Sequence, residues 1–146
     1  MRVVLGFTVA LAAAAAGCGG GDRLSQAEYV KQADAICAKY EKRLDALPQP
    51  KSTADLKTLV DKVLPIAREG KADLKELKPP EDLEAKVEEW HKRNDRNVEL
   101  IEELGQAAED GGEEKIQTLA SEADENESQA DRLARELGLE DCAEDG

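Results

Sequence analysis

The chain has 146 residues and a formal net charge of −13, with 33 acidic residues against 20 lysines and arginines. This charge excludes nucleic acid and anionic lipid head groups as partners held by the protein surface, because both would be repelled. The length suits one domain with a buried core.

A secretory signal is the first predicted element along the chain. The basic Arg2 precedes an uncharged run from Val3 to Ala16, and the small Gly17 follows. This run is shorter than the stretch of about 20 apolar residues that a membrane-spanning helix needs. We therefore expect residues 1–17 to be a signal peptide that is removed on export.

The residues at the end of this signal, Ala15-Ala16-Gly17-Cys18, resemble a bacterial lipobox, although leucine is usual where Ala15 stands. The resemblance implies that Cys18 becomes the first residue of the mature chain and carries lipid, which anchors the protein to the outer face of the cell membrane. Residues 18–24 then form a flexible tether, and residues 25–146 form a single domain. The alternative is a plain secreted protein in which Cys18 is a spare thiol.

Four helical stretches follow the tether, because apolar residues recur at spacings of three and four and sustained alternation is missing. Ser25 and Glu28 match a capping box at the start of the first stretch. The predicted boundaries are a first helix from Ser25 to Pro48, a second from Thr53, a third after Pro79-Pro80, and a fourth between the turn Glu109–Glu113 and Gly138.

Helices joined by short loops predict an all-α, up-down-up-down four-helix bundle. The regular apolar stripes favour coiled-coil-like packing. Pro65 lies inside the second stripe, where it removes one backbone donor and clashes with the preceding turn. We therefore expect the second helix to kink or break near Pro65.

Three asparagines, Asn94, Asn97 and Asn126, fall on the predicted core stripes of the third and fourth helices. Asn97 and Asn126 lie at nearly equal distances on either side of Gly111, so an antiparallel pair places them at the same height. We expect a polar layer in the middle of the bundle. It is either a pocket for a small ligand or a packing feature in which the asparagines bond one another and hold the helix register.

Cys37 and Cys142 remain when Cys18 is lipidated, and an exported chain favours a disulfide between them. Helix length makes the bridge only just reachable: Cys37 lies about 18 Å along the first helix from Ser25. The tail after Gly138 must therefore run back along the first helix, and the bridge is out of reach if the fourth helix continues past Leu139.

Catalytic and metal-binding patterns are missing from the sequence. Glu88 and His91 form one Glu-x-x-His pair, which is half of a ferritin-like di-iron motif, but the chain has no second histidine. We expect His91 to be an exposed helix residue, and we expect no catalytic residues, no metal and no cofactor. Acidic clusters at both ends of the fourth helix lack the ligand spacing of a calcium loop and are expected to be solvated.

The mature chain resembles the small helical lipoproteins of high-GC Gram-positive bacteria, through "ADAIC" (Ala33–Cys37) and "LGL-x-x-C" (Leu137–Cys142). The resemblance implies an anchored helical domain and indicates no activity. We expect a non-enzymatic interaction or scaffold domain of the cell envelope, with an envelope protein as partner. The alternative is a small-molecule or metal-binding module with its pocket at the asparagine layer.

Overall fold

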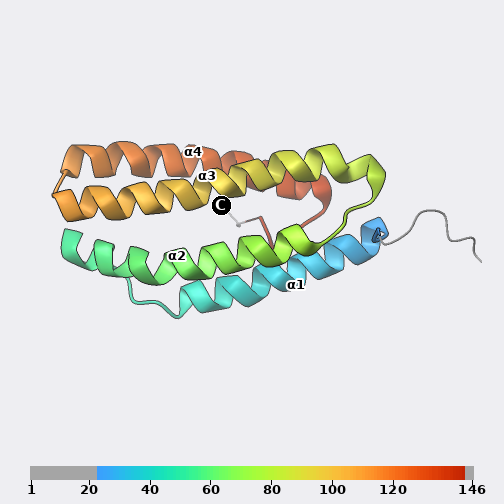
Figure 1. Ribbon diagram of the computed structural model, residues 1–146, viewed down its shortest axis with the longest axis horizontal. Coiled ribbons are helices and arrows are strands. Elements are labelled where there is room, and N and C mark those ends of the chain that lie inside the picture. The colour runs from blue at the N-terminus through green and yellow to red at the C-terminus, as the bar shows by residue number, and fades with distance from the viewer. Residues whose placement is uncertain (1–22, 144–146) are drawn as a thin grey trace, which may run out of the picture.

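The computed structural model describes residues 23–143, and within this range the chain is helical without a strand. The helices are antiparallel neighbours along the chain, so the predicted all-α, up-down-up-down bundle is confirmed (Figure 1). Its elements are α1 (Gln26–Asp45), α2 (Thr53–Glu76), the short 3-10 helix η1 (Glu81–Leu83), α3 (Glu84–Asp110) and α4 (Glu113–Leu137).

The predicted signal peptide and Cys18 lie outside the described residues. Of the expected tether, Arg23 and Leu24 are described, and both contact the connection between α2 and α3. The Leu24 amide donates to the Lys78 carbonyl at 2.9 Å, and Arg23 Nη1 donates to the Pro79 carbonyl at 3.0 Å. Within residues 23–143, no helix is long and apolar enough to cross a membrane.

Local side-chain chemistry sets the helix ends. At the start of α1 the Glu28 amide donates to Ser25 Oγ and the Ser25 amide donates to Glu28 Oε2, so the predicted capping box is present. At the C-terminal end of α4, Gly138 adopts the left-handed conformation with φ 81°. The next amide, that of Leu139, donates to the Ala134 carbonyl at 2.9 Å, which ends α4 in a Schellman motif.

Pro65 lies within α2, and the helix runs through it from Thr53 to Glu76. Of the two outcomes expected there, the break is wrong. Pro65 is exposed, so the Asp61 carbonyl that loses its helical donor lies on the outer side of the helix. Water can bond a carbonyl freed on that side, and the packing of the inner side holds the helix together.

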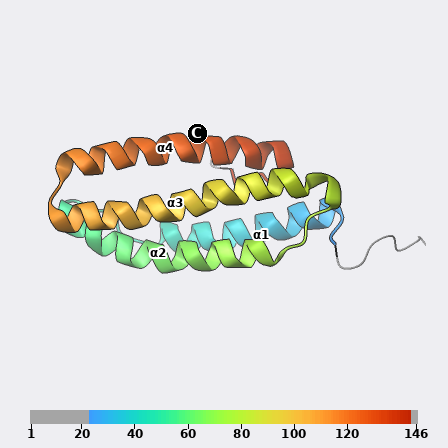
Figure 2. The ribbon, with the colours of Figure 1, turned by 45° about the horizontal axis from the view of Figure 1, so that its top comes forward.

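The four helices do not contact one another to the same extent. α3 packs along both α2 and α4, and α1 packs against α2 but makes little direct contact with α4. α1 is also the shortest of the four, so one end of the bundle consists of α2, α3 and α4 alone (Figure 1). In the rotated view α1 and α4 again lie apart (Figure 2). The bundle is therefore open between its first and last helices.

Two glycines allow the close contacts of α2 with its neighbours. A Cβ placed on Gly70 would lie 3.0 Å from the Tyr40 ring, and a Cβ on Gly105 would lie 2.7 Å from Val60 Cγ1. Gly70 therefore gives room for Tyr40 of α1 to lie flat against α2, while Gly105 lets Val60 of α2 reach the backbone of α3. The apolar stripes of the sequence did not indicate either contact.

A disulfide joins Cys37 of α1 to Cys142 of the tail, with the Cα atoms 5.1 Å apart, as predicted. α4 ends at Leu137, which lets the tail turn back toward α1. Leu139 is fully buried under this tail, and the Asp141 amide donates to Asp34 Oδ1 at 3.2 Å. The tail thus spans the opening between α1 and α4 at one end of the bundle.

Candidate functional site

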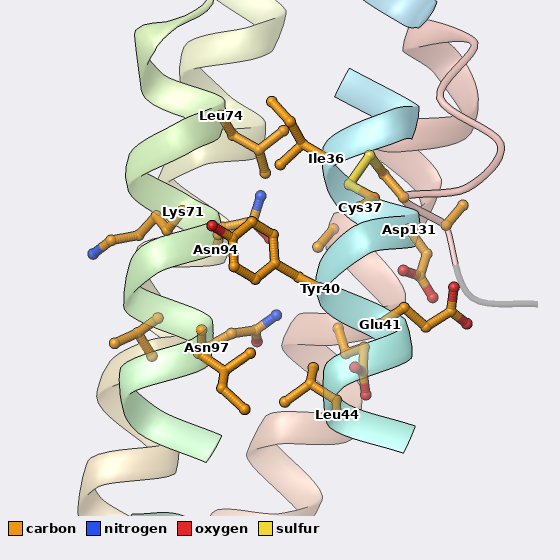
Figure 3. A pocket seen from close by; sticks show the side chains of 18 of the residues that line it. Ile36, Cys37, Tyr40, Glu41, Leu44, Lys71, Leu74, Asn94, Asn97 and Asp131 are labelled. Atoms are coloured by element: carbon orange, nitrogen blue, oxygen red, sulfur yellow. A yellow bond between two sulfur atoms is a disulfide. The ribbon is translucent and has the colours of Figure 1, made fainter. Parts of the chain in front are cut away.

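A hollow of about 760 Å³ lies in the opening between α1 and α4 and is lined by all four helices and the tail. We call it the groove. Both apolar clusters of the core contribute to its lining: Leu74 and Ala130 belong to the cluster that contains Trp90, and Ala123 packs against the cluster that contains Leu100. Its volume is in the range of small-molecule sites. Figure 3 shows Asn94, Asn97 and Tyr40 between the ribbons of the surrounding helices.

The contact predicted between Asn97 and Asn126 is present. Asn126 Nδ2 donates to Asn97 Oδ1 at 2.6 Å and to the Arg93 carbonyl at 2.9 Å. Arg93 Nη1 in turn donates to Asn126 Oδ1 at 3.3 Å. Asn126 is only 5% exposed, and its amide group is fully hydrogen-bonded inside the bundle. These bonds link α4 to α3 and hold the two helices in register. Arg93 is a member of this network that the stripe of core positions did not reveal.

Asn94 does not join that network, so the expectation of one layer formed by all three asparagines is only partly right. The side chain lines the groove, and its Nδ2 is buried without a hydrogen-bond partner among the described residues. A buried donor left unpaired costs about 1–3 kcal/mol. Asn94 is therefore a polar group at the groove whose hydrogen-bonding capacity the described part of the fold leaves unused.

Tyr40 forms the wall of the groove between α1 and α2 and is 6% exposed. Its hydroxyl donates to Asp73 Oδ2 at 2.6 Å, and Lys39 Nζ lies 3.1 Å from the same carboxylate oxygen. The hydrogen bond to Asp73 raises the pKa of Tyr40, and the same bond lowers the pKa of Asp73. These bonds and the contact with Gly70 hold the ring in one position.

Carboxylates surround the mouth of the groove. Lys71 is the only cationic side chain among the described lining residues, and its Nζ lies 3.0 Å from Asp95 Oδ1, with which it is paired. The acidic lining residues come from α1, α4 and the tail: Glu41, Asp45, Glu127, Asp131, Glu140 and Asp141. The mouth therefore carries a strong excess of negative charge.

Asp34 lies beside the tail, and its pKa reflects this setting. Burial raises the pKa of the Asp34 carboxyl, and the negative charges of Asp141 and Glu140 raise it further, while the backbone hydrogen bond from Asp141 opposes them. Burial is therefore the main reason why the pKa of Asp34 is raised.

His91 is half-buried beside Trp90, with ring centroids 5.2 Å apart, so the expectation of an exposed histidine is wrong. Its Nδ1 is buried and has no partner among the described residues. Burial lowers the pKa of His91, and the nearby Lys75 acts in the same direction. His91 lies next to the core stripe and not on it, so its position in the sequence did not indicate this burial. Lys75 of the neighbouring helix α2 lies near it.

Over residues 23–143 no group of histidine, cysteine, aspartate and glutamate side chains is arranged to hold a metal ion. Fold and groove together define a helical bundle whose open side is closed in part by a disulfide-held tail. The chain matches no protein family model, no curated protein and no solved structure.

Proposed function

We propose that this protein is a membrane-anchored binding module, and that the groove takes a small, largely apolar molecule that carries a hydrogen-bond acceptor. This is the second of the two functions expected from the sequence, without its metal. The unpartnered Nδ2 of Asn94 is the observation that carries the proposal. Nδ2 is covered in this structure, so a rotation of the Asn94 amide toward the groove would let an acceptor on a bound molecule satisfy this donor. The apolar lining would bury the rest of the molecule.

The composition of the lining favours binding over catalysis. The described residues that line the groove include carboxylates, amides and a paired lysine, but no histidine, serine or threonine. Its cysteines are joined in the disulfide and carry no thiol. A serine, threonine or cysteine nucleophile next to a base is a common requirement for covalent catalysis, and the described lining residues supply none of these nucleophiles.

We propose an extracytoplasmic location with a lipid anchor at Cys18, on the strength of the lipobox-like sequence. Arg23 and Leu24 bind the α2–α3 connection, so the anchor would hold that end of the bundle near the bilayer. Changing Cys18→Ser should release the protein from membranes or leave it unprocessed. Membrane fractionation with mass measurement of the chain tests this. A Cys18→Ser protein that is correctly cut and still membrane-bound would show that the anchor is elsewhere.

Thermal unfolding with the neutral probe 2-hydroxyethyl decanoate tests the groove. A ligand at 100 times its dissociation constant adds about 2.7 kcal/mol to the free energy of unfolding, so the unfolding temperature of the full chain should rise. Ala123→Phe places a ring in the groove lining and should abolish the rise. Ala120→Phe is the matched control, because Ala120 is exposed on the same helix and does not line the groove.

The two phenylalanine variants are first compared without the probe, so that a folding defect is recognised. An equal response of wild type, Ala123→Phe and Ala120→Phe would place the probe outside the groove and refute the proposal. No response in any of the three would also refute it, and would favour the scaffold function in which helix surfaces meet an envelope protein.

A further inference from the structure

We infer that the ligand of the groove is an organic cation, whose apolar body enters between α1 and α4 while its positive group stays among the carboxylates at the mouth. This inference rests on the proposed function and adds the sign of the ligand's charge. It is drawn from the shape of the groove and the distribution of charge along it.

The apolar part of the groove lies deep and the charged part lies at the mouth. Ile66, Val98 and Ile101 come from α2 and α3, the two helices that form the floor. Glu41 belongs to α1 and Asp131 to α4, the two helices that border the opening, and Figure 3 shows both carboxylates on the side where the tail crosses. A molecule with an apolar body and a positive end matches both zones at once.

The length of the groove limits the size of the occupant. The lining residues of α1 run from Ile36 to Asp45, which corresponds to about 14 Å of helix. This is too short for a partner helix of ordinary length but suits an alkyl chain with a compact head group. A small amphiphile is therefore favoured over a peptide helix.

Two of the carboxylates at the mouth, Glu41 and Asp131, are left without a cationic partner by the described residues. No hydrogen bond or ion pair joins Glu41 or Asp131 to another described residue, and Lys71 is paired with Asp95. Glu41 is exposed and Asp131 is half-buried. Charges of one sign that lie close together attract an opposite charge, most strongly at low salt. An anionic amphiphile of the same shape would be repelled at this point.

Three decanoyl esters test the sign of the charge, because they share one tail and one ester acceptor. They are decanoylcholine, 2-hydroxyethyl decanoate and 2-sulfoethyl decanoate, whose head groups are positive, neutral and negative. Dissociation constants for the full chain are measured by equilibrium dialysis at low salt. The side-chain amide resonances of Asn94 and Asn97 report whether the groove is occupied. We expect decanoylcholine to bind about tenfold more tightly than the sulfonate.

Matched charge variants separate the groove from the general acidity of the protein. Glu41→Gln with Asp131→Asn should weaken decanoylcholine binding about threefold to tenfold and leave the neutral ester unchanged. Glu89→Gln with Asp124→Asn removes the same charge from exposed positions outside the groove and should have a much smaller effect. Residues 1–22 are common to all variants, so any binding to them cancels in the comparison.

Each other outcome overturns a distinct claim. If all three esters shift the Asn94 resonance with equal affinity, the groove binds its ligand without charge selection and the present inference is wrong. If the two pairs of charge variants weaken decanoylcholine binding equally, the cation responds only to net charge, and the inference is again wrong. If no ester shifts the Asn94 or Asn97 resonances, the proposed function itself fails.

Discussion

Tyr29 is a fully buried side chain whose hydroxyl has no partner among the described residues. Burial raises its pKa to about 12, because the phenolate form would be poorly solvated in the core. The ring packs in the apolar cluster beneath the tail. Its packing stabilises the fold, whereas its buried hydroxyl without a partner destabilises it.

Replacing Tyr29 by phenylalanine should therefore raise the free energy of unfolding by about 1 kcal/mol at neutral pH. The wild-type protein should also lose stability as pH rises from about 10 to 12, because the unfolded tyrosine ionises before the folded one, by at most about 2.7 kcal/mol. Tyr29→Phe should lack this part of the alkaline loss. Urea unfolding of both proteins at pH 7 and above pH 10 provides the measurement, and parallel pH profiles would contradict it.

The hydrogen bond between Asn97 and Asn126 couples α3 to α4 at the level of the groove. Asn126→Leu alone strands Asn97 and the Arg93 carbonyl contact, and should lower the free energy of unfolding by about 1–3 kcal/mol. The double change Asn97→Leu with Asn126→Leu should cost less, or stabilise the fold, because no partner is left unpaired. Denaturant unfolding of the single and double variants checks this. A single variant as stable as the double would mean that the two side chains do not act as partners.

At the scale of helices, the approach of α2 to α3 depends on Gly105. Alanine there would gain up to about 1 kcal/mol in helix propensity, but its Cβ would lie 2.7 Å from Val60 Cγ1. Val60 is β-branched and buried, so it cannot easily rotate away and the helices must move apart. The close contact, and not helix propensity, therefore decides whether Gly105→Ala raises or lowers the free energy of unfolding.

We expect Gly105→Ala to lower the free energy of unfolding by about 1–3 kcal/mol. Val60→Ala in the same chain should remove the clash, so that Gly105→Ala becomes neutral or stabilising in that background. A double-mutant cycle by chemical denaturation measures this coupling. Additive effects of the two changes would show that the contact does not limit the spacing of α2 and α3.

At the scale of the whole molecule, the Cys37–Cys142 disulfide links elements 105 residues apart. It holds the tail across the opening between α1 and α4, where direct helix contact is slight. The disulfide therefore joins α1 to the end of α4 on this side of the bundle, whereas direct helix packing joins the neighbouring helices on the other three sides. Loop closure of this length corresponds to about 4–5 kcal/mol in the chain-entropy model.

Replacing both cysteines by serine should lower the free energy of unfolding by up to this amount. The loss should be visible as a fall in the urea midpoint, and a reductant should lower the midpoint of the wild type but not of the double-serine variant. Mass spectrometry of the unreduced wild type should show that neither Cys37 nor Cys142 carries a free thiol. Two free thiols, or equal stability of the two proteins, would contradict this account of how the tail is held.

Much of the fold could be predicted from the sequence because its causes are local. Ser25 and Glu28 cap a helix within one turn, and Gly138 ends one through its own backbone conformation. The height of Asn97 opposite Asn126 followed from counting outward from a short turn, because a short loop fixes the register of an antiparallel pair. The disulfide followed from the expected compartment and the reach of four residues after Gly138.

Only the tertiary structure decided that the bundle is open between α1 and α4, and hence that a groove exists. Side-chain spacing along one helix cannot show how far two helices stand apart, because that distance depends on volumes contributed by other elements. Gly70 and Gly105 allow α1 and α3 to approach α2 closely, while α1 and α4 make little direct contact and are linked by the tail through the disulfide. The burial of His91 and the unpaired amide of Asn94 have the same origin, since both depend on what a neighbouring helix covers or leaves free.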